Sequence, residues 1–195
     1  MNPEAALPTR RLEAGASIVQ AKPWHSEPVS LESPAVSVMT DLTQVKAATT
    51  GPQTSLRHAE QQMIYQGVRM LFVVTEMPSL LGLITTTDLG GDRAVRIVQQ
   101  RGLRYDELTV GDVMTSLASL DAVELDALRT ATVRNLIATL KVHGRNHLLV
   151  VEGGGAAALR VRGVISRAQI ERQLGKPIEL VEVAGSFAEL GQMLT

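Results

Sequence analysis

Two short polar segments carry the side chains of this sequence that are best suited to hold a small ligand. The first is Thr85-Thr86-Thr87-Asp88, and the second is Ser166-Arg167-Ala168-Gln169. An ionised carboxylate accepts hydrogen bonds from two neighbouring hydroxyls at once, so Asp88 is suited to clamp a ribose. Each segment follows an apolar run. Where a strand ends and a helix begins, free backbone N–H groups and the hydroxyl of Thr85 or Ser166 form a seat for phosphate.

The two segments differ in charge at the last position. Gln169 stands where the first segment has Asp88, and its uncharged amide cannot reproduce a two-point anionic contact with a ribose. Arg167 partly compensates, because a guanidinium beside Ser166 can hold a phosphate. The sequence therefore predicts a first site suited to ribose and a second site suited to phosphate.

A purely structural interpretation of the same residues stays open. Thr85 or Thr87 can simply cap a helix, with Asp88 placed favourably against the helix dipole. His143 and His147 are four residues apart, but Gly144 ends the helix between them, so no metal site is expected. Three arginines are expected on a solvated helix face, namely Arg93, Arg96 and Arg101.

The elements that position these segments occur twice in the chain. Val38-Met39-Thr40 returns as Val113-Met114-Thr115, Gly67 returns as Gly144, and Gly82 returns as Gly163, at offsets of 75, 77 and 81 residues. Three blocks in one order at nearly constant spacing indicate an internal duplication, which sets the unit of folding.

Each repeat predicts the same order of elements. The expected first strands are residues 44–47 and 122–125, and the helices that follow carry apolar positions at Leu56, Ala59 and Met63 or at Val133, Leu136 and Leu140. Ser55 or Thr54 is the expected N-cap of the first of these helices, and Gly67 and Gly144 are the expected stops.

Two further strands and a last helix complete each repeat. The strands are expected at residues 71–75 and 81–85, and at 148–152 and 161–166. The last helix restarts after Gly90-Gly91 with an apolar face of Ala94, Val95, Ile97 and Val98, and its second copy includes Ile170 and Leu174. The predicted fold class is α/β, with two β-α-β-β-α repeats packed pseudo-symmetrically.

The repeated blocks resemble the cystathionine-β-synthase (CBS) domain, which occurs in tandem pairs. The resemblance rests on the Val-Met-Thr opening, the Gly-x-x-x-Leu-x-Val-Val strand and the Gly-x-x-Thr-x-x-Asp close, over about residues 36–175. It implies a compact disc that dimerises and binds an adenosine compound (AMP, ATP or S-adenosylmethionine) between the repeats. It also implies ligand contacts from Thr40 in the opening motif and from polar groups before the paired-valine strands, namely Arg69, Asn146 and His147. For His147, a structural hydrogen-bonding role is the alternative.

The chain departs from the family pattern at two places. Phe72 and Leu149 stand where the family often has Pro before the paired valines. Both residues are apolar and can be extended, so the strand is still expected and only the rigid entry that Pro gives is lost. Gln169 replaces the closing acid of the second motif, so occupancy of the second site is not assured. The predicted site comprises Thr40, Arg69, Thr85, Thr86, Asp88, Asn146, His147, Ser166, Arg167 and Gln169.

Composition narrows the function classes. A net charge of −1 and 3% aromatic residues do not favour nucleic-acid binding. The absence of Cys excludes disulfides and thiolate chemistry, and with no apolar run long enough for a membrane span we expect a cytoplasmic protein. No catalytic triad, P-loop or metal-ligand cluster is present, so the sequence predicts a regulatory binding module rather than an enzyme. A degenerate, non-binding pair that acts as a dimerisation scaffold is the alternative.

The sequence predicts four segments: an N-terminal arm at 1–35, repeats at 36–105 and 106–175, and a C-terminal extension at 176–195. Residues 17–21 are either a short strand or disordered. The extension is expected to form a strand and a helix with Phe187 and Leu190 buried, since Ser186 and Glu189 match a capping box. Uncovered apolar helix faces predict a homodimer. Output is expected to pass through a separate effector protein or through the terminal segments.

Overall fold

The structure is a computed structural model in which residues 9–11, 14–15, 17, 27–154 and 157–179 are described. The expected strand at 17–21 lies almost wholly outside these residues, and the expected C-terminal strand and helix lie outside them beyond residue 179.

The helices and strands follow the predicted order twice. The first half contains η1 (Ala35–Val38), β1 (Met39–Asp41), β2 (Thr49–Thr50), α1 (Leu56–Gln66), β3 (Met70–Val74), β4 (Leu80–Thr85), α2 (Thr86–Gly90) and α3 (Asp92–Arg101). The second contains η2 (Tyr105–Glu107), α4 (Val110–Val113), β5 (Thr115–Ser116), η3 (Leu117–Ser119), β6 (Ala122–Glu124), α5 (Leu125–Thr130), α6 (Val133–His143), β7 (His147–Gly154), β8 (Ala157–Ser166) and α7 (Arg167–Leu174).

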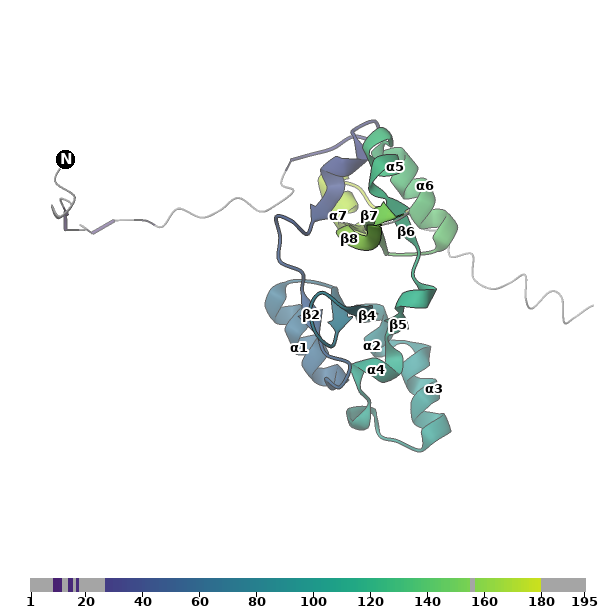
Figure 1. The fold of residues 1–195 in the computed structure, drawn as a ribbon. Coiled ribbons are helices and arrows are strands. Elements are labelled where there is room, and N and C mark those ends of the chain that lie inside the picture. The colour runs from purple at the N-terminus through teal and green to yellow at the C-terminus, as the bar shows by residue number, and fades with distance from the viewer. Residues whose placement is uncertain (1–8, 12–13, 16, 18–26, 155–156, 180–195) are drawn as a thin grey trace, which may run out of the picture.

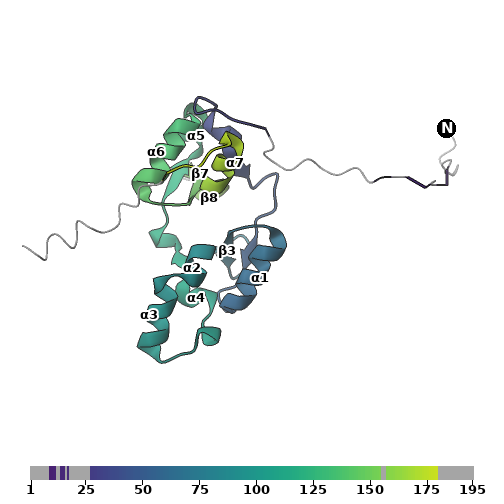
Figure 2. The same ribbon diagram turned by 180° about the vertical axis from the view of Figure 1, so that it is seen from behind.

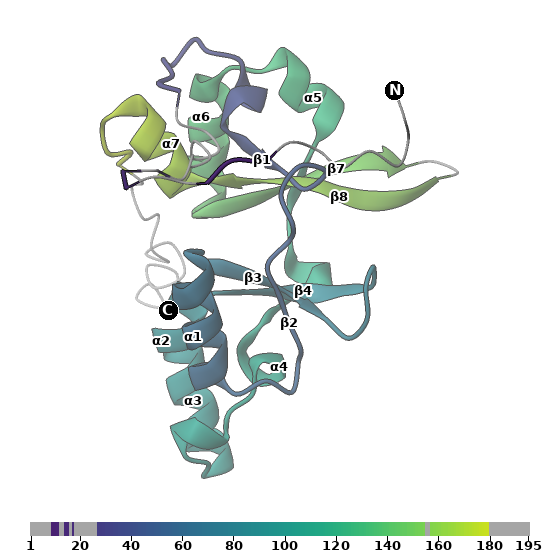
Figure 3. The ribbon, with the colours of Figure 1, turned by 90° about the vertical axis from the view of Figure 1, so that its left-hand side faces the viewer.

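The strands form two four-stranded sheets that face each other. One has the order β1-β8-β7-β6 and the other β2-β3-β4-β5. Figure 3 shows the two sheets as stacked layers, with α5 and α6 over the outer face of one and α1 to α4 against the outer face of the other. A small apolar cluster that includes Phe72, Leu83 and Val164 fills the space between the sheets, and a larger core lies on the outer side of each. The predicted α/β fold class is confirmed.

The two repeats exchange their opening strands. β1 pairs with β8 of the second repeat, with Thr40 opposite Val164, whereas β5 pairs with β4 of the first repeat, with Thr115 opposite Leu83. Figure 1 shows β5 beside β4 in the lower half of the molecule, and both Figure 1 and Figure 2 show the chain crossing from the upper half to the lower half before α1. Each sheet is therefore built from both halves of the sequence.

The exchange explains the glycine in each repeated Gly-x-x-Thr/Ser motif. A Cβ on Gly82 would lie 2.2 Å from the backbone oxygen of Thr115 in β5. A Cβ on Gly163 would lie 2.9 Å from the backbone oxygen of Thr40 and 2.7 Å from the side chain of Met39. The incoming strand packs so closely that a side chain on either glycine would push it away.

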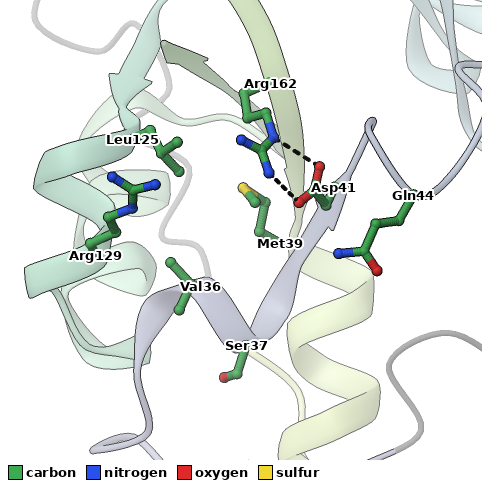
Figure 4. Close-up of a pocket in the computed structure, with 8 residues that line it drawn as sticks. All are labelled: Val36, Ser37, Met39, Asp41, Gln44, Leu125, Arg129 and Arg162. Atoms are coloured by element: carbon green, nitrogen blue, oxygen red, sulfur yellow. Dashed lines mark hydrogen bonds and ion pairs between the residues drawn. The ribbon is translucent and has the colours of Figure 1, made fainter.

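An ion pair also ties the incoming strand β1 to the second sheet. Arg162 donates from Nε to Oδ1 of Asp41 at 2.9 Å and from Nη2 to Oδ2 at 2.7 Å, and its Nη1 donates to Glu152 at 3.0 Å. Figure 4 shows this bidentate contact at one side of a pocket of about 400 Å³ between β1 and α5. Both charges of the β1–β8 pair are largely buried, with side-chain exposures of 11% for Asp41 and 24% for Arg162.

The two long predicted helices are confirmed with their caps. Ser55 accepts a hydrogen bond from the N–H of His58 at the start of α1, and Gly67 ends the helix in the left-handed region at φ 65°. α6 begins at a capping box in which Asn135 accepts from both the N–H and the hydroxyl of Thr132. The apolar positions predicted to face the core are buried in both helices.

Two predictions about local structure are wrong. The first strand of the first repeat is Thr49–Thr50 and not residues 44–47, because Asp41 accepts hydrogen bonds from Thr43 and from the N–H groups of Gln44 and Val45 and so turns the chain there. In α3, the buried side consists of Ala94, Ile97 and Val98. Val95 is 52% exposed, since it lies outside that i, i+3, i+4 stripe.

The chain before β1 and after α7 packs against the second repeat. The N–H of Val29 donates to the carbonyl of Gln173, and the N–H of Ala35 donates to that of Ala131. After α7, Ile178 is buried in the same core. The last residues of the predicted N-terminal arm and the first of the C-terminal extension are thus part of the folded body.

We predict that Gly82→Ala destabilises the protein, because its Cβ would collide with the backbone of β5. Overpacking of this kind costs about 1–3 kcal/mol, which lowers the melting temperature of a chain of this size by about 3–10 °C. Calorimetry would measure the change. Gly90→Ala is the matched control, since its Cβ would meet nothing within 4 Å. Equal melting temperatures for the two variants would contradict the close packing of β5 on β4.

We also predict that the free energy of unfolding falls at acid pH because Asp41 becomes protonated. The hydrogen bonds from Arg162, with help from Thr43, hold the pKa of Asp41 far below its usual range, although burial opposes this. A lowered carboxyl pKa gives stability that is complete above the unfolded pKa of about 3.9 and is lost as the pH falls below it. Between pH 6 and pH 2.5 the wild type should lose about 1–2 kcal/mol more unfolding free energy than Asp41→Asn.

Denaturant unfolding at the two pH values tests this prediction about Asp41. Asp126→Asn is the control, because its carboxylate is 89% exposed and should leave the pH dependence unchanged. The same pH dependence in wild type and Asp41→Asn would show that the ion pair contributes nothing to folding.

Candidate functional site

Three connected cavities lie where the two repeats meet, and each takes residues from both repeats. We name them the first cleft, the second cleft and the junction pocket. The first cleft has a volume of about 170 Å³ and is lined by Leu83, Thr85, Thr87, Asp88, Thr115, Leu120, Asp121, Gly144, Arg145, Asn146, His147 and Leu149. The second cleft has about 220 Å³ and is lined by Thr40, Leu42, Val45, Lys46, Ala47, Ala48, Gly67, Val68, Arg69, Met70, Phe72, His147, Val164, Ser166, Ala168, Gln169 and Arg172. The junction pocket has about 270 Å³ and is lined by Arg69, Thr86, Thr87, Asn146, His147, Ser166, Arg167, Ala168 and Glu171.

The strand exchange makes the first cleft composite. In the first repeat, Thr85 ends β4 and Asp88 lies in the α2 helix that follows, while in the second repeat Asn146 directly precedes β7 and His147 begins it. Thr115 comes from the second repeat's opening motif but sits in the first repeat's sheet. A ligand in this cleft would therefore touch both halves of the chain.

Asp88 caps α2 with one of its carboxylate oxygens. Its Oδ2 accepts from the N–H of Thr85 at 2.8 Å and from the hydroxyl of Thr85 at 2.7 Å, and the N–H of Asp88 donates back to that hydroxyl. The structural interpretation of Thr85 and Asp88 as a helix cap is thus confirmed. The other oxygen, Oδ1, accepts no hydrogen bond from the described part of the chain, so a capping Asp88 keeps an acceptor for a ligand.

The second cleft has no equivalent capping box. Ser166 forms no side-chain cap at the start of α7. Gln169 instead makes contacts along its own helix, donating from Nε2 to Gln173 at 3.1 Å and accepting from Arg172 at 3.0 Å. The polar end of Gln169 is therefore engaged, in contrast to Oδ1 of Asp88.

The junction pocket brings two arginines close to the starts of α2 and α7. Arg167 donates from Nε to Glu171 at 2.9 Å and from Nη1 to Asn146 at 3.4 Å. Glu171 also accepts from the N–H of Ile178 at 2.9 Å. Burial alone would raise the pKa of Glu171, but the hydrogen bonds from Ile178 and Arg167 outweigh it and hold the pKa below its usual value. The pocket is thus linked through Glu171 to the start of the C-terminal extension.

His147 lines all three cavities and lies at their centre. Burial and the positive charge of Arg69 lower its pKa to about 4, although Asp88 acts in the opposite direction. The imidazole is therefore neutral near pH 7, and it lines the cavities as a polar side chain without adding charge.

All ten residues predicted from the sequence line at least one of the three cavities. Thr85 and Asp88 lie in the first cleft, Thr40 and Gln169 lie in the second, and Thr86 and Arg167 lie in the junction pocket. Arg69 and Ser166 are shared by the junction pocket and the second cleft, and Asn146 by the junction pocket and the first cleft. Their contact with a ligand stays a prediction.

Sequence reasoning missed several lining residues. Thr115 carries the same motif as Thr40 and could have been found from the repeat alone. The charged residues Lys46, Asp121, Arg145 and Arg172 stand outside the repeated motifs, so no signal in a single sequence identified them.

In the described part of the chain, no group of three or more His, Asp or Glu side chains is arranged to hold a metal ion. None of its helices combines the length and apolar character that crossing a membrane requires.

Comparisons with known proteins agree with this architecture. Residues 36–89 match the family model of the CBS domain. No curated protein matches the sequence. Among solved structures, an uncharacterised conserved protein from Pyrococcus horikoshii is similar, with a TM-score of 0.55 and 21% identity over 77% of this chain and 98% of that one.

Two further structures have the same fold. The Arabidopsis thaliana CBS-pair protein CBSX2, solved in complex with AMP, has a TM-score of 0.51 and 20% identity over 72% of this chain and 94% of that one. A CBS-domain protein from Agrobacterium tumefaciens has a TM-score of 0.51 and 21% identity over 68% of this chain and 88% of that one. Residues 36–89 are therefore a CBS domain, and together with the equivalent second repeat they give this chain the fold of a tandem CBS pair.

Proposed function

We propose that this chain is a regulatory, non-catalytic module that binds an adenosine compound of the AMP, ATP or S-adenosylmethionine class. The observation that carries the proposal is the composite first cleft, in which Asp88 and Thr85 of one repeat face Asn146 and Thr115 of the other. The module reports the ligand to a separate effector protein.

The first cleft suits a nucleoside in its chemistry. Leu83, Leu120 and Leu149 supply apolar surface for a base. Oδ1 of Asp88 is available to accept from a ribose hydroxyl, which gives a charge-assisted hydrogen bond. The same fold binds AMP in CBSX2, which supports the choice of ligand class.

The phosphate end of the ligand fits the junction pocket, which continues from the first cleft through Thr87, Asn146 and His147. Arg69 and Arg167 carry the positive charge there. Because Arg167 contacts Glu171 and Glu171 contacts the N–H of Ile178, a phosphate that draws Arg167 away would weaken the anchor of the C-terminal extension. We propose this extension as the route of output.

Asp88→Asn tests the ligand role of Asp88 separately from its capping role. Asn135 forms the same capping box with Thr132 in α6, so an Asn at position 88 preserves the cap but removes the charge and the second acceptor oxygen. Losing a charge-assisted hydrogen bond costs about 1.5–3 kcal/mol, so AMP affinity should fall about tenfold or more. Isothermal titration calorimetry measures the change.

Asp112→Asn is the matched control for Asp88→Asn. Asp112 caps α4 through the same contacts with Thr109 and lies outside the three cavities. Its substitution should leave AMP affinity unchanged. Absence of AMP and ATP binding to the wild type at millimolar concentration would refute the proposal and favour a non-binding dimerisation scaffold.

We further propose that the module is a homodimer. Tyr65 on α1 is 93% exposed beside the exposed Ile64, and Val142 at the equivalent position of α6 is 82% exposed. Large apolar side chains in water at the ends of both helices are typical of an interface. Light scattering should give twice the 21.0 kDa of one chain, and Tyr65→Glu should shift the mass toward one chain. A wild-type mass of 21.0 kDa at micromolar concentration would contradict the dimer.

A further inference from the structure

The two clefts are lined by equivalent positions of the two repeats but have net charges of opposite sign. Asp121 in the first cleft and Lys46 in the second each follow the threonine of their opening motif by six residues and line their cleft just before a strand. Asp88 and Gln169 are the other equivalent pair. At both pairs, the first cleft has a carboxylate where the second has a cation or an uncharged amide.

The second cleft carries three cations and no carboxylate. Lys46, Arg69 and Arg172 line it, and within the described residues none of them forms an ion pair. His147 is neutral near pH 7 and adds no charge. The lining of the second cleft is therefore net positive by three charges, whereas the first cleft, with Asp88 and Asp121 against Arg145, is net negative by one.

The second cleft also provides an apolar floor and continues into the junction pocket. Phe72, Met70 and Val164 are buried between the two sheets and form that floor. Arg69 and Ser166 line both cavities, so the lining is continuous from Lys46 to Arg167, whose charge is paired with Glu171. This is a surface for an apolar base followed by a chain of phosphates.

We propose that the second cleft binds a nucleoside triphosphate through its polyphosphate, while the first cleft binds a nucleoside with at most one phosphate through Asp88. The proposal rests on the nucleotide-binding function proposed above and assigns a different ligand charge to each cleft. Cations without carboxylate partners attract a ligand in proportion to its negative charge, so affinity in the second cleft rises from AMP to ATP. The carboxylates of the first cleft repel a polyphosphate in the same way.

The test is calorimetric titration of the full chain with AMP, ADP and ATP. The wild type should bind ATP at a site that Asp88→Asn leaves intact, and the double variant Lys46→Gln/Arg172→Gln should weaken ATP binding there about tenfold. The same double variant should leave the Asp88-dependent binding of AMP unchanged. The double variant Lys141→Gln/Arg96→Gln is the matched control, because both residues are exposed on helices outside the three cavities.

Salt provides a second readout that does not depend on a variant. Raising KCl from 50 to about 500 mM shortens the screening length, so ATP binding in the second cleft should weaken more than AMP binding in the first.

If AMP binds in an Asp88-dependent manner but ATP affinity is the same in wild type and Lys46→Gln/Arg172→Gln, this inference fails and the proposed function stands. If no nucleotide binds, both fail.

Discussion

The structure depends on the exchange of one strand between the two repeats. β1 and β5 each leave the repeat in which their sequence motif begins and complete the sheet of the other. The exchange requires a backbone without side chain at Gly82 and Gly163, since the incoming strand lies against both. Neither repeat can form its full sheet alone, and every cavity at their junction is consequently shared.

Sharing of the cavities gives a physical basis for regulation. Asp88 of one repeat and Asn146 of the other line the first cleft together, so the binding free energy of a ligand there would act on their relative position. The contacts from Arg167 through Glu171 to Ile178 extend the same coupling to the C-terminal extension. The two clefts also differ chemically, because the first has a capping carboxylate with an available oxygen at Asp88, while the second has the amide of Gln169 at the equivalent position.

The sequence predicted most of the elements, and its ten candidate residues all line the cavities at the junction, because both follow from local patterns. The contact of these residues with a ligand stays a prediction. Apolar spacing and Gly67 are sufficient to place α1, and the hydroxyl-rich ends of two strands are sufficient to place Thr85 and Ser166. The exchange of β1 and β5 could not be predicted, since strands of three and two residues with mostly polar side chains carry no information about their partners. The displaced first strand has a similar cause: the hydrogen bonds of Asp41 turn the chain where composition alone favours extension. The charges of the clefts depend on Lys46 and Asp121, which only the fold brings beside the motifs.

If ligand binds in the cleft that the exchanged strands build from both repeats, AMP must perturb both repeats at once. Titration of the ¹⁵N-labelled chain with AMP, followed by amide chemical shifts, measures this. We expect Thr115 and Asn146 of the second repeat to shift together with Thr85 and Asp88 of the first, at one common affinity. Shifts confined to one repeat, or centred on the pocket between β1 and α5 beside Arg162, would contradict it.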